Sequence, residues 1–80
     1  MSDAYLDPAY TVIRALGGFE AVAKITSKHI SRVYRWTYPK ARGGTGGLIP
    51  QPEAAKLLAH AKTHRLPVTA ESFFSRGEAA

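Results

Sequence analysis

The basic residues in the middle of the chain are the ones whose type and spacing could do chemistry. Residues 21–52 contain six of the eleven Lys and Arg residues and none of the six Asp and Glu residues. Ammonium groups attract phosphate, and a guanidinium can also donate two parallel hydrogen bonds to O6 and N7 of guanine. Positive charge gathered on one segment that also carries hydrogen-bonding side chains is typical of proteins that bind DNA.

Length and composition limit the class of protein. Eighty residues suffice for one domain with a small core, and the net charge of +5 favours a polyanionic partner. The absence of cysteine excludes a disulfide framework and a thiolate zinc site. No apolar run approaches the roughly 20 residues that span a bilayer, and the first residues lack the features of a secretory signal. We expect no membrane partner, and a cytoplasmic protein associated with the nucleoid when bound to DNA.

The elements that must position the basic residues begin with a helix near residue 8. Asp7 is a candidate N-cap and Pro8 a candidate first helical residue, since Asp accepts backbone N–H groups and Pro needs no partner for its nitrogen. Apolar residues then recur at helical spacing until a glycine pair stops the element: Ala9, Val12, Ile13 and Leu16, followed by Gly17 and Gly18.

Residues 19–38 contain neither Gly nor Pro, so two arrangements fit them. On a single helical wheel the apolar residues fall on one broad side, and opposite them lie Lys24, Lys28, Arg32 and Arg35. One continuous helix is therefore a fair rival. Thr26 and Ser27 favour a break, because their side chains compete with the helical backbone and prefer caps. We expect one of these two residues to cap a second helix that begins near Lys28 and ends before Pro39.

The rest of the chain predicts a loop and two more helices. Residues 40–47 form a basic, glycine-rich loop, and residues 48–50 form a short apolar return. A helix then starts at Pro52 and Glu53, with an inner stripe of Ala54, Leu57, Leu58 and Ala61. Thr69 is a candidate cap for a final short helix that reaches Phe74.

The expected fold is all-α, a compact bundle of about five short helices over residues 7–75. Residues 1–6 and 76–80 are expected to be loose termini, although Tyr5 and Leu6 could dock on the core.

The pattern over residues 17–36 resembles the helix-turn-helix domains of the lambda Cro and repressor type and of the related YdaS-type regulators. The residues that carry this resemblance are Gly17, Gly18, Val22, Ala23, Val33 and Trp36. It implies a close helix crossing at Ala23 and a core contact that fixes the second helix through Trp36. The chain departs from the family at the turn, where Thr26, Ser27 and Lys28 replace the usual Leu-Gly-Val.

The resemblance implies that the helix from about Lys28 to Thr37 lies in the major groove, while the preceding helix braces against the DNA backbone. The expected contact residues on this helix and the following loop are Lys28, His29, Ser31, Arg32, Tyr34, Arg35, Lys40, Arg42 and Thr45. One of Arg32 and Arg35 could read a base while the other grips phosphate. Tyr34 is either a phosphate donor or a partly buried core aromatic.

Phosphate contacts make affinity depend on salt. The cations expected to neutralise phosphates are Lys24, Lys28, Lys40, Arg42 and, less directly, Lys56. If about five do so, log affinity should fall with log salt at a slope of about −4 to −5.

The glycine-rich loop does not predict a nucleotide site. It lacks the spacing of a phosphate-binding loop, and Pro50 and Pro52 follow where the phosphate-binding helix should start. Two interpretations remain open. The loop is either a flexible connector, or it lies along the DNA backbone with its exposed N–H groups, the Thr45 hydroxyl, Lys40 and Arg42.

Catalysis and metal binding have little support in the sequence. His60 and His64 have a spacing that could hold zinc, but no third ligand stands at an obvious position. The few carboxylates are scattered, and no nucleophile, base and orienting group stand together. We expect no enzyme, no metal and no cofactor.

The leading hypothesis is a sequence-specific regulator of transcription that binds double-stranded DNA, most similar to a phage or prophage Cro-type repressor that occludes a promoter. One alternative keeps DNA as the partner and makes the protein an antitoxin or an architectural or excision factor. Another class is a protein-interaction module such as an anti-repressor, with residues 19–38 as one continuous helix. RNA binding is weaker, because no aromatic stacking platform on strands is indicated. A homodimer on DNA is possible, with contacts from residues 73–74 or 48–49.

Overall fold

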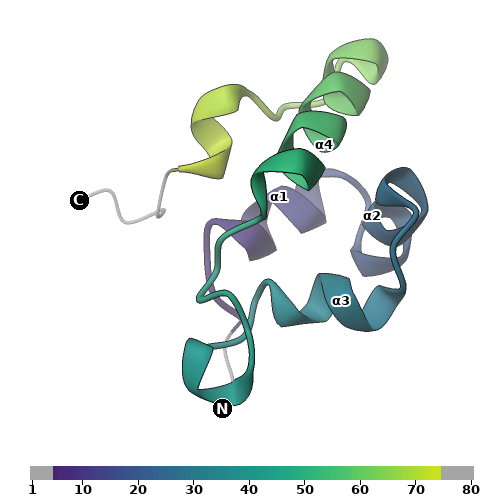
Figure 1. The fold of residues 1–80 in the computed structure, drawn as a ribbon. Coiled ribbons are helices and arrows are strands. Elements are labelled where there is room, and N and C mark those ends of the chain that lie inside the picture. Colours follow the sequence, from purple (N-terminus) through teal and green to yellow (C-terminus); the bar gives the residue numbers. More distant parts are fainter. Residues whose placement is uncertain (1–4, 75–80) are drawn as a thin grey trace.

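The computed structural model describes residues 5–74, and within this range every regular element is helical (Figure 1). The α-helices are α1 (Ala9–Ala15), α2 (Phe19–Thr26), α3 (Ile30–Arg35) and α4 (Gln51–His64). Two short 3-10 helices accompany them, η1 (Lys40–Arg42) after α3 and η2 (Ala70–Phe73) after α4. The all-α prediction is confirmed for the described residues.

The predicted number of five helices is wrong, because the last of them is a single 3-10 turn. Thr69 does begin this turn: its backbone N–H donates to Ser72 Oγ at 3.0 Å, in a reciprocal capping box. The turn closes through 3-10 bonds, which rarely continue beyond a few residues. The four described α-helices are therefore followed by one short capped turn.

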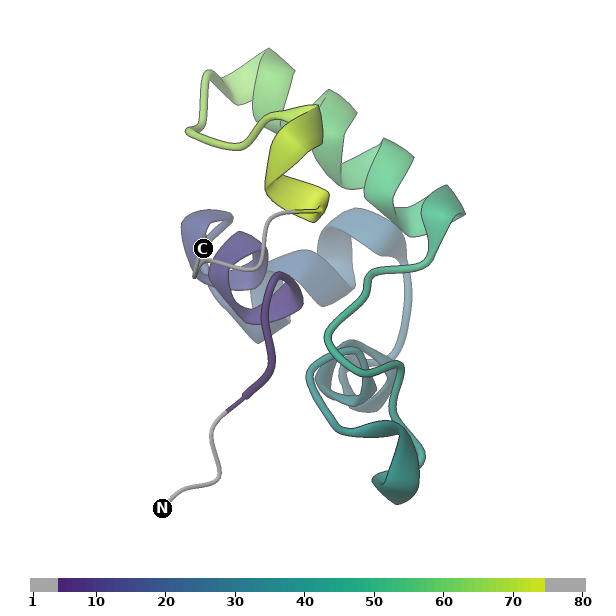
Figure 2. The ribbon, with the colours of Figure 1, turned by 90° about the vertical axis from the view of Figure 1, so that its left-hand side faces the viewer.

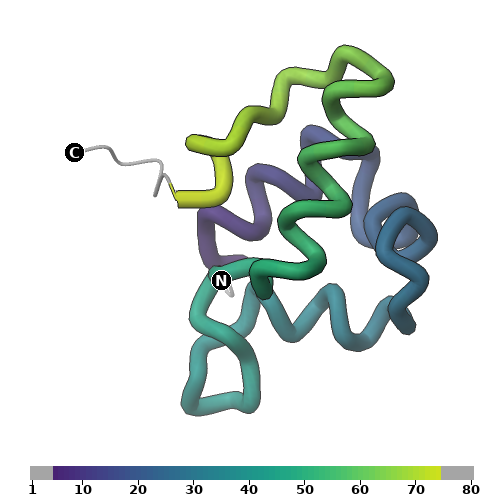
Figure 3. Tube along the Cα trace, turned by 45° about the horizontal axis from the view of Figure 1, so that its top comes forward, coloured from purple at the N-terminus to yellow at the C-terminus, as the bar shows by residue number. Residues whose placement is uncertain are grey.

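The helices pack around α2, which contacts α1, α3 and α4. α3 and η1 lie at the lower end of the molecule, whereas α4 and η2 lie at the upper end (Figures 1 and 2). The trace in Figure 3 shows the chain descending from α3 into the loop around η1, rising through α4, and then turning back down to η2. Among residues 5–74, no other α-helix lies below α3 in Figure 1.

The core receives side chains from all four α-helices. Completely or almost completely buried are Val12, Ile13, Val22, Val33 and Leu57. Trp36 is buried with them, which confirms its predicted structural role, and the inner stripe predicted for α4 is confirmed by Leu57 and Ala61. Phe73 also enters the core, whereas its neighbour Phe74 is 79% exposed.

The first helix ends as predicted but begins one residue later than expected. The Gly17 and Gly18 N–H groups donate to the carbonyls of Arg14 and Ile13, and both glycines have φ near +108°. Side chains rarely adopt this backbone conformation, which explains the glycine pair. Pro8 precedes α1 instead of forming its first turn.

Asp7 nevertheless behaves as a capping side chain. Its Oδ1 accepts the Thr11 backbone N–H at 3.0 Å and the Thr11 hydroxyl at 2.7 Å. The carboxylate thus satisfies one of the free N–H groups in the first turn of α1.

The predicted break between α2 and α3 is confirmed, and the rival of one continuous helix over residues 19–38 is wrong. A three-residue turn, Ser27–His29, separates the two helices. Ser27 adopts the left-handed conformation with φ 58°, and the Lys28 N–H donates back to the Ala23 carbonyl at 3.1 Å. This is the bonding by which a helix commonly ends.

The chain ends are described only in part. Residues 1–4 and 75–80, which include most of the predicted loose termini, lie outside the described residues. Leu6 does dock, since its N–H donates to the Thr37 carbonyl at 2.9 Å, and Tyr5 packs against Tyr10 with ring centroids 4.9 Å apart.

Candidate nucleic-acid interface

The outer face of α3 carries two exposed arginines. Val33 is completely buried on the inner face, while Ser31, Arg32 and Arg35 are exposed. The predicted helix from Lys28 to Thr37 is too long, because α3 runs only from Ile30 to Arg35. The residues that follow turn into the core: Trp36 is buried, and the buried Thr37 donates its hydroxyl to the Tyr34 carbonyl.

The cap of α3 is His29, which corrects the prediction that Thr26 or Ser27 caps it. Thr26 is buried and donates its hydroxyl to the Val22 carbonyl at 2.8 Å, and Ser27 is left-handed. Neither residue therefore has the extended backbone of an N-cap, whereas His29 has φ −65° and ψ 145°. The Ser31 N–H donates to His29 Nδ1 at 3.1 Å, and Ser31 Oγ lies 3.0 Å from the same nitrogen.

Lys28 is held by an acid from outside the basic segment. Its Nζ lies 3.4 Å from Glu53 Oε2, and the Glu53 side chain, in the first turn of α4, is 11% exposed. No acid lies within residues 21–52, yet Lys28 is paired with one that α4 supplies. Among residues 5–74 this is the one ion pair, so Arg32 and Arg35 keep their charges unpaired within that range.

The glycine-rich loop is fastened to the end of α3. The Thr45 N–H donates to the Arg35 carbonyl at 3.1 Å, and the Gly46 N–H donates to the Tyr38 carbonyl at 2.9 Å. A Cβ at Gly44 would overlap both carbonyl oxygens, so only glycine allows the two backbone segments to approach. The interpretation as a flexible connector therefore does not fit this loop.

The prediction that loop N–H groups are free for phosphate is also wrong for residues 42–46. Each of these N–H groups donates to a carbonyl within residues 35–40. The Thr45 hydroxyl faces the carbonyl oxygens of Trp36 and Leu48, and its single proton is used inside the protein. The exposed side chains on the loop that can donate hydrogen bonds are those of Lys40 and Arg42.

Tyr34 belongs to an aromatic cluster beside this face. Its ring stacks on Phe19 with centroids 4.0 Å apart and planes 8° apart, and Tyr5 and Tyr10 extend the cluster. Of the two roles left open for Tyr34, the structure shows the partly buried one. No pattern along the chain indicates this cluster, because its members come from the N-terminal segment and three different helices.

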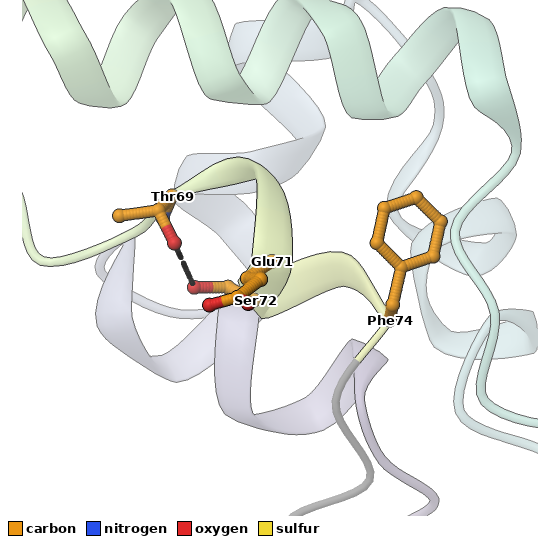
Figure 4. A pocket seen from close by; sticks show the side chains of 4 residues that line it. All are labelled: Thr69, Glu71, Ser72 and Phe74. Carbon is orange, nitrogen blue, oxygen red and sulfur yellow. Dashed lines mark hydrogen bonds between the residues drawn. The ribbon is translucent and has the colours of Figure 1, made fainter.

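Other surfaces offer less chemistry. Figure 4 shows an open hollow beside η2, lined by Thr69, Glu71, Ser72 and Phe74, in which Thr69 and Ser72 bond to each other. The rings of His60 and His64 lie 4.2 Å apart, yet no third potential ligand joins them within the described range. Among residues 5–74, no helix combines the length and apolar character needed to cross a bilayer.

No protein-family model, curated protein or solved structure matches the chain. The geometry of α3 and of the loop therefore carries the functional inference.

Proposed function

We propose that this protein is a sequence-specific, double-stranded-DNA-binding regulator of transcription, in which α2, the turn at residues 27–29 and α3 act as a helix-turn-helix. The observation that carries the proposal is the division of α3 into two faces. Val33 anchors the inner face in the core, while Arg32 and Arg35 stand exposed on the outer face with no acid paired to them within residues 5–74. An arginine in this setting can donate to a base edge or to phosphate.

The charges around α3 favour a polyanion over a protein partner of mixed charge. Neither α3 nor the loop contains an acid, and the one carboxylate of α4, Glu53, is paired with Lys28. The exposed cations on α2, α3 and the loop are Lys24, Arg32, Arg35, Lys40 and Arg42. Glu20, in the first turn of α2, is the one exposed acid on these elements, so α3 and the loop form the part of the surface with a single sign of charge. Positive charge gathered in this way speeds association with DNA and binds its backbone.

The proposed roles follow from position. Arg35, on the outer face of the helix that would enter the major groove, donates to a guanine edge. Phosphates are bound by four cations: Lys24, Arg32, Lys40 and Arg42. The hydrogen bonds between the loop and α3 hold Lys40 and Arg42 at a fixed position relative to Arg35. A protein bound in this way occludes a promoter, which is repression of the Cro type.

The proposed phosphate contacts differ from the five expected from the sequence: Lys28 is paired with Glu53 and Lys56 lies on α4, so both are left out, and Arg32 is added. Four phosphate contacts give a slope of log affinity against log salt of about −4 per bound protomer. The slope should be measured on a single duplex between low and physiological salt.

Selection of bound fragments from a random pool of duplexes tests the proposal directly. The wild-type protein should enrich a defined sequence, and Arg35→Ala should lose preference at one or two base pairs. Lys62→Ala is the matched control, because it removes one exposed cation at the end of α4 remote from α3 (Figure 1). Enrichment of no sequence, or equal behaviour of the two variants, would reject the proposed role of α3.

The structure does not fit the alternative of a protein-interaction module. This alternative required one continuous basic helix over residues 19–38, and α2 ends at Thr26. The alternative of a DNA-binding antitoxin needs a second partner surface. Phe74, the most exposed large apolar side chain among the described residues, is the residue to substitute in a search for such a partner.

A further inference from the structure

The cap of α3 fixes where the His29 ring can carry its proton. A backbone N–H can only donate, so His29 Nδ1, which accepts from the Ser31 N–H, must present its lone pair. Ser31 Oγ, 3.0 Å from the same nitrogen, can then serve only as a second donor. In the neutral imidazole the proton is therefore on Nε2.

The second ring nitrogen faces away from this cap. Nδ1 and Nε2 point to nearly opposite sides of an imidazole, so a ring whose Nδ1 faces the first turn of α3 directs Nε2–H away from the helix. His29 is exposed, and no hydrogen bond joins its Nε2 to any residue in the range 5–74. The ring thus offers a free donor just before the start of α3.

The charged neighbours of His29 favour an acceptor that belongs to a polyanion. Lys28 precedes it and is paired with Glu53 of α4, while Arg32 lies three residues further on, exposed on α3. Residues at the N-terminal end of a helix in the major groove contact base edges.

We propose that His29 is a specificity-determining residue that presents only a hydrogen-bond donor, Nε2–H, to the DNA. This inference rests on the proposed function and adds the direction of one hydrogen bond, in which the protein donates and the DNA accepts. Its partner is an acceptor: N7 of a purine, O6 of guanine, O4 of thymine or a phosphate oxygen. The amino groups of adenine and cytosine are donors and are rejected at this position, because the nitrogen that could accept from them is occupied by the cap.

The first measurement concerns the free protein. Long-range nitrogen–proton correlation spectra of the full chain, recorded at about pH 8, above the range in which histidines usually titrate, report the tautomer of each ring. The expected result for His29 is an unprotonated Nδ1 and a protonated Nε2. A protonated Nδ1 in the neutral ring would overturn the inference.

The second measurement separates the cap from the contact. His29→Ser keeps a side-chain oxygen able to cap α3 but removes the imidazole Nε2–H, and its short hydroxyl does not reach the position of that nitrogen; His29→Ala removes both the cap and the donor. Both variants should bind the selected duplex about fivefold more weakly, the equivalent of one hydrogen bond. Only His29→Ala should also lower the ratio of folded to unfolded protein, by about fivefold.

The selected sequences identify the acceptor. Loss of preference at one or two base pairs in His29→Ser assigns the donor to a base edge, and uniform weakening assigns it to phosphate. Wild-type affinity and wild-type preference in His29→Ser would overturn the inference while leaving the proposed function intact. A wild-type protein that selects no duplex would overturn the proposed function instead, and the DNA role of His29 with it, whatever the tautomer.

Discussion

Replacing Gly44 by Ala should detach the loop from α3. The added Cβ would overlap the carbonyl oxygens of Tyr38 and Arg35, and both are backbone atoms that cannot rotate away. These same oxygens accept the N–H groups of Gly46 and Thr45. Relief of the overlap costs both hydrogen bonds, at about 1 kcal/mol each, so the free energy of unfolding should fall by about 2 kcal/mol.

DNA binding should weaken for a separate reason. Lys40 and Arg42 lie in η1, and the bonds from Thr45 and Gly46 keep that turn beside the end of α3. A detached loop no longer holds these two cations against phosphate. The slope of log affinity against log salt should therefore become shallower by up to about two.

Urea unfolding and duplex titration at several salt concentrations measure the two effects. Gly43→Asn is the matched control, because a Cβ there meets no atom within 4 Å and Asn tolerates the φ of +85° better than other residues do. It should lose less than about 1 kcal/mol and keep the wild-type slope. Gly44→Ala within about 0.5 kcal/mol of wild type, with an unchanged slope, would refute this account of the loop.

Three further substitutions give results of different sign. Arg35→Ala should cost about 1–3 kcal/mol of discrimination at one base pair, measured by competition between operator variants, and a uniform loss across variants would assign Arg35 to phosphate instead. Ser27→Gly should raise the free energy of unfolding by about 0.5–1 kcal/mol in urea titrations, because Ser27 adopts the left-handed φ of 58° that glycine accepts without strain; a loss of stability would contradict this. Glu53→Gln should lower stability by about 1 kcal/mol, since Lys28 is more than a third exposed and the pair is partly screened, yet it should raise DNA affinity and steepen the salt slope by about one, because it frees Lys28. Unchanged affinity in Glu53→Gln would show that Lys28 lies away from the DNA.

The helices that periodicity and caps determine locally could be predicted from the sequence. The apolar stripes of α1 and α4 and the glycine pair at residues 17–18 act over one or two turns of helix. The same holds for the break after Thr26, where two side chains that compete with the backbone stand together. Because these signals act over a short range, the residues of each segment are enough to predict these helices and the break between α2 and α3.

The details of the candidate site depend on contacts between distant residues. Nothing near Lys28 in the chain indicates that Glu53 pairs with it, because the contact exists only once α4 folds back. The glycine content of residues 43–47 suggested flexibility, whereas glycine is needed there for a close backbone approach.

The sequence predicts the wrong N-cap for α3, because propensity does not show which residue has an extended backbone. Serine is a better N-cap than histidine by propensity, which favoured Ser27. The left-handed backbone of Ser27 instead ends α2, and the N-cap of α3 is His29, two residues further along the chain.

The most direct test of the central claim is a nitrogen–proton chemical-shift titration of the labelled protein with its selected duplex. The account predicts that the largest changes fall on residues 29–35 and 40–42, while the last turn of α4 and the turn η2 stay unchanged. Changes centred on η2 and the end of α4, or no changes at all, would contradict the claim that α3 enters the DNA groove.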